Sequence, residues 1–362
     1  MHLVINGTEL GRNRGGNETY IAGLIAGLSA LSSPPEVSVL TCQWDNDLSL
    51  PSTVHQVNLG PYRQLPFFLY QQTRALRHLE ADWYLSNYYL PPLLPCKGSV
   101  IVHDLSFRAH PEYFPPLVAW YMRWLVGWAV RRADRVLTVS TFSRDELLRF
   151  YSKAAGKVSI IPNGIGAQFR PPRDNGTAEA DQRTLSRYGL DAPYVLALGN
   201  IHPRKNLSRL LDAYLNLRSE KGAIPRMVWV GAPRWASDEL LERARSVGVI
   251  LTGFVADEDL PTLYRGAVML VYPSLYEGFG LPPMEAMACG TPVVTSNTTS
   301  LPEVVGQAAL TVDPTNVEAI AAAMARLLDH AALRSELSKA GIERSKRYTW
   351  PHTARRLLAA LQ

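Results

Sequence analysis

The chain has 362 residues, of which 47% are hydrophobic and 19% charged, and it carries a formal net charge of +5. A single hydrophobic core rarely grows beyond about 250–300 residues, so this length predicts two domains. The sequence excludes a transmembrane helix, because no apolar run reaches the roughly 20 residues needed to cross a bilayer.

Other features of the whole sequence indicate the cellular location, the cysteine chemistry and the kind of ligand to expect. The first residues, MHLVINGTEL, lack the charged and apolar regions of a signal peptide, so we expect a cytoplasmic protein. Cys42, Cys96 and Cys289 are far apart and odd in number, which argues against a disulfide framework and a zinc site. The positive charge favours an anionic ligand or an acidic membrane surface. Since there is no basic run or zinc-finger spacing, we expect no nucleic-acid partner.

The first part of the chain alternates short apolar runs with longer amphipathic segments. A helix is predicted over residues 17–31, where apolar residues recur at helical spacing and Asn17 is a plausible cap. The apolar runs predict buried parallel strands at 2–6, 37–41, 99–103, 135–139 and 157–161. This alternation predicts a doubly wound, Rossmann-like α/β domain over residues 1–165.

A second series of the same kind follows a break in the pattern. Residues 166–190 are predicted to be a linker, because the stretch 162–183 is rich in Pro, Gly, Asp and Arg and has little periodicity. A second Rossmann-like domain is predicted over 191–347. Its strands are expected at 194–199, 226–231, 249–252, 267–272 and 292–295. The last helical stretch breaks at Pro351, and a helix over 348–362 is expected to pack back on the first domain.

The segment PSLYEGFGLPPMEAMACGTPVV, residues 273–294, carries two glutamates around an abrupt turn. Its prolines are tolerated only in the first turn of a helix, so a helix is predicted to start near Leu281. The backbone donors of Gly280 and Leu281 would then suit an anion or sugar hydroxyls. Glu277 and Glu285 could each bind a vicinal diol. The alternative is that Glu285 interacts with the helix dipole and Glu277 is a solvated loop residue.

This segment, with LPEVVG at 301–306, resembles the motif of two glutamates separated by seven residues in retaining glycosyltransferases of the GT-B fold. The likeness is to the large glycogen-synthase-like group, glycosyltransferase family 4. It is strong from about residue 190 to 350 and holds only in outline before that. The resemblance implies two Rossmann-like domains that face each other across a cleft, with a nucleotide-sugar donor bound between them.

The resemblance also implies roles for individual residues. Glu285 would hold the ribose, Glu277 would contact the donor sugar, and Arg204 and Lys205 in GNIHPRKN would neutralise the diphosphate in place of a metal. In the first domain His103 would reach the donor sugar. The predicted catalytic residues are thus His103, Arg204, Lys205 and Glu277. The predicted donor-binding residues are Gly15, Gly16, Asn200, Val255, Phe279, Gly280, Leu281 and Glu285.

Two further motifs bear on the metal and the acceptor. Asp45 and Asp47 have the Asp-x-Asp form of a GT-A metal site, but we expect a chance match, and we expect no metal or other cofactor. The stretch 113–132 puts Trp120, Trp124 and Trp128 on one helical stripe near arginines. Such a stripe suits either a peripheral contact with an anionic membrane, at its inner face, or the protein core.

The predicted function is transfer of a hexose, with retention of configuration, to a saccharide or lipid-linked acceptor in polysaccharide or cell-envelope synthesis. UDP-glucose or a similar UDP-sugar is the favoured donor, and a GDP-mannose-dependent mannosyltransferase is the alternative. A nucleotide-sugar epimerase on the same scaffold, and a sugar-nucleotide binding module without catalysis, are the remaining alternatives. No single residue discriminates the donor base.

Overall fold

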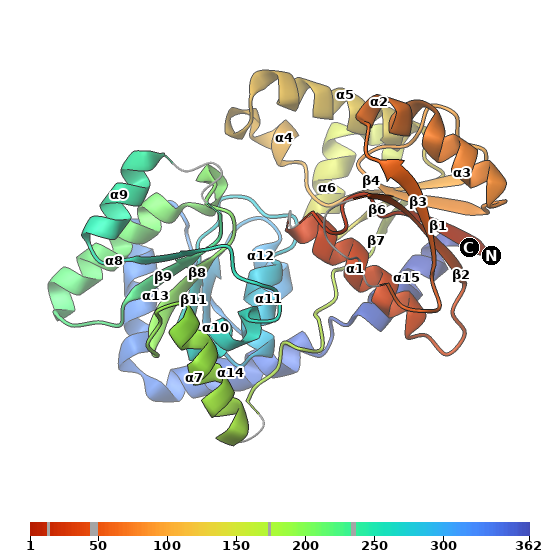
Figure 1. Ribbon diagram of the computed structural model, residues 1–362. Helices are drawn as coiled ribbons and strands as arrows, with labels where there is room; N and C mark the ends of the chain where they lie inside the picture. The colour runs from red at the N-terminus through yellow and green to blue at the C-terminus, as the bar shows by residue number, and fades with distance from the viewer. Residues whose placement is uncertain (13–14, 44–49, 173–174, 233–236) are drawn as a thin grey trace. The chain divides into compact units, whose positions relative to one another are not determined.

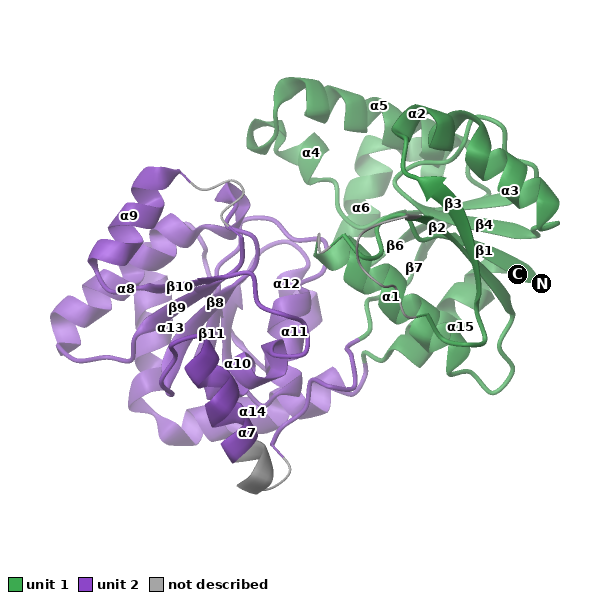
Figure 2. Cartoon of the chain, viewed as in Figure 1, with its two compact units in different colours: residues 1–164, 348–362 green, residues 165–347 purple. Residues whose placement is uncertain are grey.

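The computed structural model describes residues 1–12, 15–43, 50–172, 175–232 and 237–362. The chain forms two compact units (Figure 2): unit 1 contains residues 1–164 and 348–362, and unit 2 contains residues 165–347. Each unit is a parallel sheet covered by helices (Figure 1), so the predicted α/β class with two Rossmann-like domains is confirmed. Among the described helices, none combines the length and the apolar character needed to cross a membrane.

Unit 1 contains, in its described residues, a seven-stranded parallel sheet with the order β3-β2-β1-β4-β5-β6-β7. Its strands are β1 His2–Asn6, β2 Glu36–Gln43, β3 His55–Pro61, β4 Trp83–Asn87, β5 Lys97–Val102, β6 Arg135–Thr138 and β7 Val158–Ile160. Its helices are α1 Gly16–Ser29, α2 Gln64–Pro66, the π-helical turn η1 Phe67–Gln71, α3 Gln72–His78, α4 Ser106–Ala109, α5 Pro116–Arg132, α6 Thr141–Phe150 and α15 Trp350–Leu361; η2 Pro111–Tyr113 and η3 Ser152–Ala154 are 3-10 turns.

The five strands predicted in the first domain are present, and two more were missed. β3 is an edge strand that buries little of its surface, and its apolar residues Val57 and Leu59 are separated by Asn58, so it lacks the continuous apolar run that marked the other strands. β4 is entirely buried but includes polar residues. One of them, Ser86, accepts a hydrogen bond from Asn6 Nδ2 at 3.0 Å, which offsets the cost of its burial.

The predicted helix at 17–31 corresponds to α1, but its expected cap is wrong. Asn17 lies within the first turn, and the residue at the N-cap is Gly15, which has no side chain with which to cap the helix. Gly15 has φ 96° and ψ −147°, a conformation that residues with a Cβ avoid, so backbone geometry and not a side-chain hydrogen bond starts this helix.

Unit 2 contains, in its described residues, a six-stranded parallel sheet with the order β10-β9-β8-β11-β12-β13. Its strands are β8 Tyr194–Leu198, β9 Met227–Val230, β10 Ile250–Gly253, β11 Ala267–Tyr272, β12 Val293–Ser296 and β13 Leu310–Val312. Its helices are α7 Asn175–Arg187, α8 Leu207–Lys221, α9 Asp238–Ser246, α10 Leu260–Gly266, α11 Leu281–Ala288, α12 Leu301–Val305, α13 Val317–Asp329 and α14 Ala331–Ser345; η4 Pro203–Lys205 is a 3-10 turn. The short edge strand β13 was not predicted.

Part of the expected linker 166–190 is helical. α7 packs within unit 2, where Leu185 is buried and Asp181 forms an ion pair with Arg265 of α10 at 2.5 Å. The segment is strongly polar, so the sequence pattern alone does not reveal a helix that these tertiary contacts stabilise.

The predicted break near Pro351 is confirmed, as is the return of the last helix to the first domain. α14 ends at Ser345 and α15 begins at Trp350, after Thr349 as its N-cap. α15 packs along α1 (Figure 1), and the Trp350 and Tyr20 ring centroids are 5.7 Å apart.

Both sheets reverse their winding direction at one point. The reversal falls between β1 and β4 in unit 1 and between β8 and β11 in unit 2. All strand pairs are parallel, so the loops that follow these strands meet at the carboxyl edge of each sheet. Sheets of this kind bind ligands at that edge, next to the reversal.

Candidate active site

The reversal point of unit 2 brings together the loops after β8 and β11. Residues Pro203–Lys205 form the turn η4, and the loop after β11 reaches it through the Leu275 N–H, which donates to the Arg204 carbonyl at 2.7 Å. Asn206, directly after η4, makes further contacts with the neighbouring loops. Its Nδ2 donates to the carbonyls of Pro273 (3.1 Å) and Pro314 (2.6 Å). These contacts fix two loops that the sequence separates by about 70 residues.

Three of the predicted catalytic residues meet there. Arg204 lies 2.8 Å from Glu277 Oε2, and Lys205 Nζ lies 2.6 Å from Glu277 Oε1. Tyr272, at the end of β11, donates its hydroxyl to the same Oε1 at 2.9 Å and accepts a hydrogen bond from Lys205. Only 6% of Glu277 and 9% of Lys205 is exposed, so the cluster is a buried, hydrogen-bonded network.

The cluster carries a net positive charge. Burial by itself would raise the pKa of Glu277, but the charges of Arg204 and Lys205 outweigh it and lower the pKa to about 2. The carboxylate is therefore ionised at neutral pH, and two cations face one anion. Such a cluster can attract a further anion such as a diphosphate.

Helix α11 presents backbone donors beside this cluster. Its N-cap is Gly280, with φ 115° and ψ 61°, and a Cβ at this position would lie 2.7 Å from Leu301 Cδ2. In the described part of the chain, neither the Gly280 nor the Leu281 N–H donates to another residue. Ser300 Oγ lies 2.8 Å from the Phe279 carbonyl and 2.9 Å from the Glu277 carbonyl, which holds the turn in place.

Glu285 differs from Glu277 in its electrostatics. None of the described lysines and arginines forms an ion pair with it, and its Oε2 accepts a hydrogen bond from the Tyr264 hydroxyl at 2.8 Å. Burial raises the pKa of Glu285 to about 7; the Tyr264 hydrogen bond opposes the shift and Asp257 adds to it. A carboxyl group with this pKa exchanges its proton near neutral pH, and a ligand hydroxyl that donates to it would favour the ionised form.

Two other predicted donor-binding residues lie along the same edge. Asn200 is exposed just after β8, and Val255 is buried just after β10. Tyr272, Tyr264 and Ser300 contact the predicted residues but were not predicted themselves. Tyr272 and Tyr264 lie in apolar segments, and no local pattern distinguishes them from core residues.

In unit 1, His103 follows β5 at the carboxyl edge of the sheet. Its Nε2 lies 3.1 Å from Asn87 Oδ1, and since that oxygen only accepts, Nε2 carries the proton. Burial lowers the pKa of His103 to about 4, against the opposing effect of Asp104. The imidazole is therefore neutral at physiological pH.

Gly15 and Gly16 lie at the start of α1, in the loop that follows β1 on this edge. A Cβ added at Gly16 would meet no atom of the described residues beyond its chain neighbours within 4 Å. This open backbone could be approached closely by a ligand.

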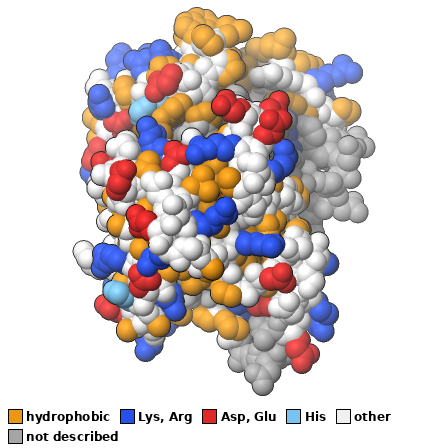
Figure 3. Space-filling view, turned by 90° about the vertical axis from the view of Figure 1, so that its left-hand side faces the viewer, with side chains coloured by type: hydrophobic (Ala, Val, Ile, Leu, Met, Phe, Trp, Pro, Cys, Tyr) orange, Lys and Arg blue, Asp and Glu red, His pale blue; other side chains and the backbone are white. Residues whose placement is uncertain are grey.

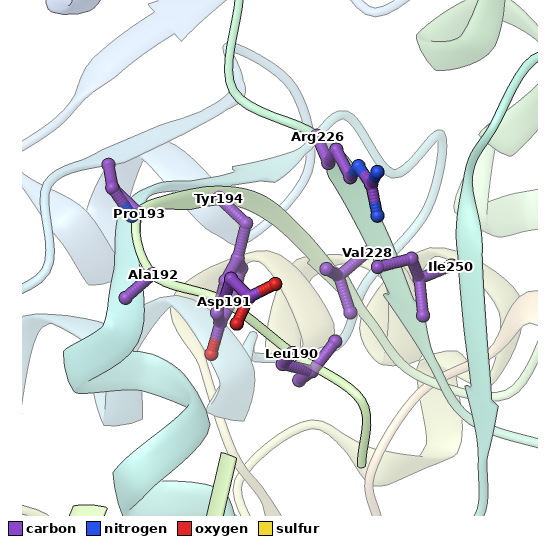
Figure 4. A pocket seen from close by; sticks show the side chains of 8 residues that line it. All are labelled: Leu190, Asp191, Ala192, Pro193, Tyr194, Arg226, Val228 and Ile250. Atoms are coloured by element: carbon purple, nitrogen blue, oxygen red, sulfur yellow. The ribbon is translucent and has the colours of Figure 1, made fainter. Parts of the chain in front are cut away.

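A pocket of about 310 Å³ lies elsewhere in unit 2 (Figure 4). Its lining includes Tyr194, Arg226 and Ile250, at the amino ends of β8, β9 and β10, so it opens on the edge opposite to the residues above. None of the predicted site residues lines it, and we do not assign the active site there. Asp45 and Asp47 lie outside the described residues; within these, no group of three or more His, Cys, Asp or Glu side chains could hold a metal.

Comparisons with known proteins match both halves of the chain to glycosyltransferase families. Residues 181–344 match the family model described as glycosyl transferases group 1, and residues 14–169 match the model of glycosyltransferase family 4. The chain is 38% identical over 286 residues to an O-antigen chain mannosyltransferase B of Escherichia coli, a match that covers 77% of this chain and 74% of that protein. It is 33% identical over 270 residues to a serotype-specific mannosyltransferase WbdA of the same species, covering 72% of this chain but only 33% of that longer protein.

A solved structure shows the fold over the whole chain. The sucrose-phosphate synthase of Thermosynechococcus elongatus superposes with a TM-score of 0.78 at 24% identity, covering 99% of this chain and 100% of that one. The sequence matches show the family and the structural likeness shows the fold. The chain belongs to the family 4 glycosyltransferases (glycosyl transferases group 1), which have the GT-B fold.

Proposed function

We propose that this glycosyltransferase is a retaining, GDP-mannose-dependent mannosyltransferase that extends a polysaccharide of the O-antigen type. The donor favoured by the sequence-based prediction is a UDP-sugar, with GDP-mannose as the alternative. The relatives at 38% and 33% identity are both mannosyltransferases, which favours the alternative. The observation that carries the proposal is the Arg204–Lys205–Glu277 cluster at the reversal point of the unit 2 sheet, which could bind a diphosphate. The mannosyltransferase relatives support the choice of donor.

In the proposed reaction, the donor diphosphate binds at Arg204 and Lys205, next to the N–H groups of Gly280 and Leu281. The bond from the anomeric carbon to the phosphate oxygen breaks, and negative charge develops on that oxygen. The two cations and the peptide donors stabilise the charge, in the way that fixed donors stabilise an oxyanion. These groups take the place of a metal ion in stabilising the departing diphosphate, so we expect transfer without a metal.

The acceptor hydroxyl forms the new bond to the anomeric carbon on the face that the phosphate leaves. Its proton passes to the departing phosphate oxygen, and the configuration is retained. His103 is neutral, so it can hydrogen-bond a hydroxyl of the donor sugar without placing a positive charge beside an oxocarbenium-like transition state. Glu285, with its pKa near 7, would accept hydrogen bonds from the ribose.

Donor identity is tested by thermal denaturation with GDP, UDP and ADP, followed by their sugars. At a concentration 100 times its dissociation constant, a ligand stabilises by about 2.7 kcal/mol, so GDP should clearly raise the midpoint while UDP and ADP do not. Arg204→Gln should abolish the GDP effect. Arg183→Gln is the matched control, since Arg183 is an exposed arginine on α7, away from the cluster.

Turnover is tested by incubating the protein with GDP-mannose and a mannose-terminated acceptor, and assigning the anomeric configuration of the product by NMR. We expect an α-linked product, as in the donor, and unchanged transfer with a chelator. Stabilisation by UDP alone would overturn the donor assignment. Isomerised donor without an acceptor would replace transfer by epimerisation.

A further inference from the structure

Two helical segments of unit 1 leave large apolar side chains in solvent. Six side chains with exposed fractions between 50% and 75% define what we term the apolar face: Leu65, Leu69, Tyr70, Leu117, Trp120 and Trp124. Figure 3 shows hydrophobic side chains gathered along the upper edge of that view. Single exposed apolar residues are common, but a contiguous group of this size marks an interaction surface.

The apolar face follows helical spacing. Leu117, Trp120 and Trp124 are three and four residues apart on α5, and Leu65 and Leu69 are four apart across α2 and η1. The rings of Phe68 and Trp128, 6.3 Å apart, join the two segments. The two alternatives for the tryptophan stripe therefore divide along one helix. Trp128 packs on Phe68, whereas Trp120 and Trp124 are more than half exposed, with the Trp124 ring stacked 6.5 Å from that of Trp128.

Positive charge surrounds the apolar face. Residues 62–78 and 113–133 contain no Asp or Glu. Their exposed arginines are Arg63, Arg74, Arg77, Arg131 and Arg132. None of these forms an ion pair with a carboxylate in the part of the chain that the structure describes. Charge complementarity thus calls for an anionic partner.

A second copy of the chain fits this surface poorly. In a two-fold dimer the same patch meets itself, so the arginines of one copy would face those of the other across a desolvated contact. A bilayer fits better, because tryptophan and tyrosine favour the interface between headgroups and acyl chains while arginine binds acidic headgroups.

We infer that the apolar face docks this protein on an anionic lipid bilayer, with Trp120 and Trp124 in the headgroup region and the five arginines on acidic headgroups. The face is linked to the carboxyl edge of the unit 1 sheet, since the Phe67 ring lies 5.5 Å from that of Tyr62, and Arg12, in the loop after β1, lies 5.4 Å over the Tyr62 ring. Docking would therefore bring this edge near the headgroups. An edge close to the headgroups could reach a lipid-linked acceptor, and this consequence rests on the proposed function. The docking itself does not.

Vesicle flotation of the full chain tests the inference without donor or acceptor, so it can fail while the proposed function stands. The protein should float with vesicles containing phosphatidylglycerol and not with phosphatidylcholine alone. Trp120→Ser/Trp124→Ser and Arg131→Gln/Arg132→Gln should each lower the partition coefficient about tenfold or more. Arg183→Gln/Arg245→Gln removes two exposed arginines from unit 2 and should bind like the wild type.

Circular dichroism and the unfolding midpoint verify that each variant folds, and Leu117→Gln replaces the tryptophan variant if that one does not. Absence of flotation with anionic vesicles would overturn the inference, as would tryptophan variants that float like the wild type. Analytical ultracentrifugation tests whether a second copy of the chain binds the apolar face instead. A wild-type dimer that Trp120→Ser/Trp124→Ser converts to a monomer would show that the face joins two copies.

Discussion

Lys205 contributes to the fold as well as to the proposed chemistry, and paired substitutions separate the two. Lys205→Met leaves the buried Glu277 carboxylate with Arg204 alone, which should cost about 3–5 kcal/mol of unfolding free energy. Lys205→Met/Glu277→Gln also removes the buried carboxylate that has lost one of its two cationic partners, and it should recover most of that stability. Transfer should stay at least roughly 100-fold below wild type in both variants.

Urea unfolding and mannosyl-transfer kinetics measure the two effects. Recovery of transfer along with stability in the double variant would mean that Lys205 acts only through the fold.

Glu285 should make stability depend on pH in the direction opposite to a paired carboxylate. Its pKa is about 7 in the folded protein and near 4.5 when unfolded, so between these values only the folded state keeps the proton. The unfolding free energy therefore falls as pH rises from about 4.5 to 7, by on the order of 3 kcal/mol. Glu285→Gln cannot ionise, so it should be more stable than wild type at pH 8 and equal to it at pH 4.

Urea unfolding at the two pH values checks this prediction, and calorimetry should show weaker GDP binding by the same variant. An equal difference between variant and wild type at both pH values would contradict the assigned pKa.

At the scale of elements, the start of α11 depends on a residue without a side chain. Gly280→Ala must adopt φ 115° and place its Cβ 2.7 Å from Leu301, so we expect a loss of about 3 kcal/mol and weaker nucleotide binding. Gly189→Ala is the matched control. It also has positive φ but meets no atom within 4 Å, and it should cost about 1 kcal/mol. Equal losses in the two variants would show that α11 tolerates the side chain.

At the scale of the whole molecule, the end of the chain completes the unit in which the chain begins. Trp350 of α15 lies against α1, where a Cβ at Gly23 or Gly27 would overlap it. Trp350→Ala should lower the stability of unit 1 by about 3–5 kcal/mol. Hydrogen exchange should then speed up in β1 and α1 but not in β8 and β11. Equal acceleration in both units would mean that Trp350 stabilises more than its own unit.

The sequence by itself determined the features that repeat over short distances. Apolar periodicity predicted the five strands at each core and helix α1, and the prolines around Leu281 predicted where α11 begins. The order of residues in 273–294 indicated the family, which the comparisons with known proteins confirm. Local patterns suffice here because each depends on residues within one or two turns.

Only the tertiary structure decided which distant residues meet and which apolar residues are buried. Lys205 and Glu277 lie 72 positions apart and pair because β8 and β11 are neighbours in the sheet. The polar helix α7 is held in unit 2 by contacts such as the Asp181–Arg265 ion pair. The tryptophan stripe divides because Trp128 packs on Phe68 while Trp120 and Trp124 stay more than half exposed. The physical reason is the same throughout: burial and ion pairing depend on strand order, which no local pattern contains.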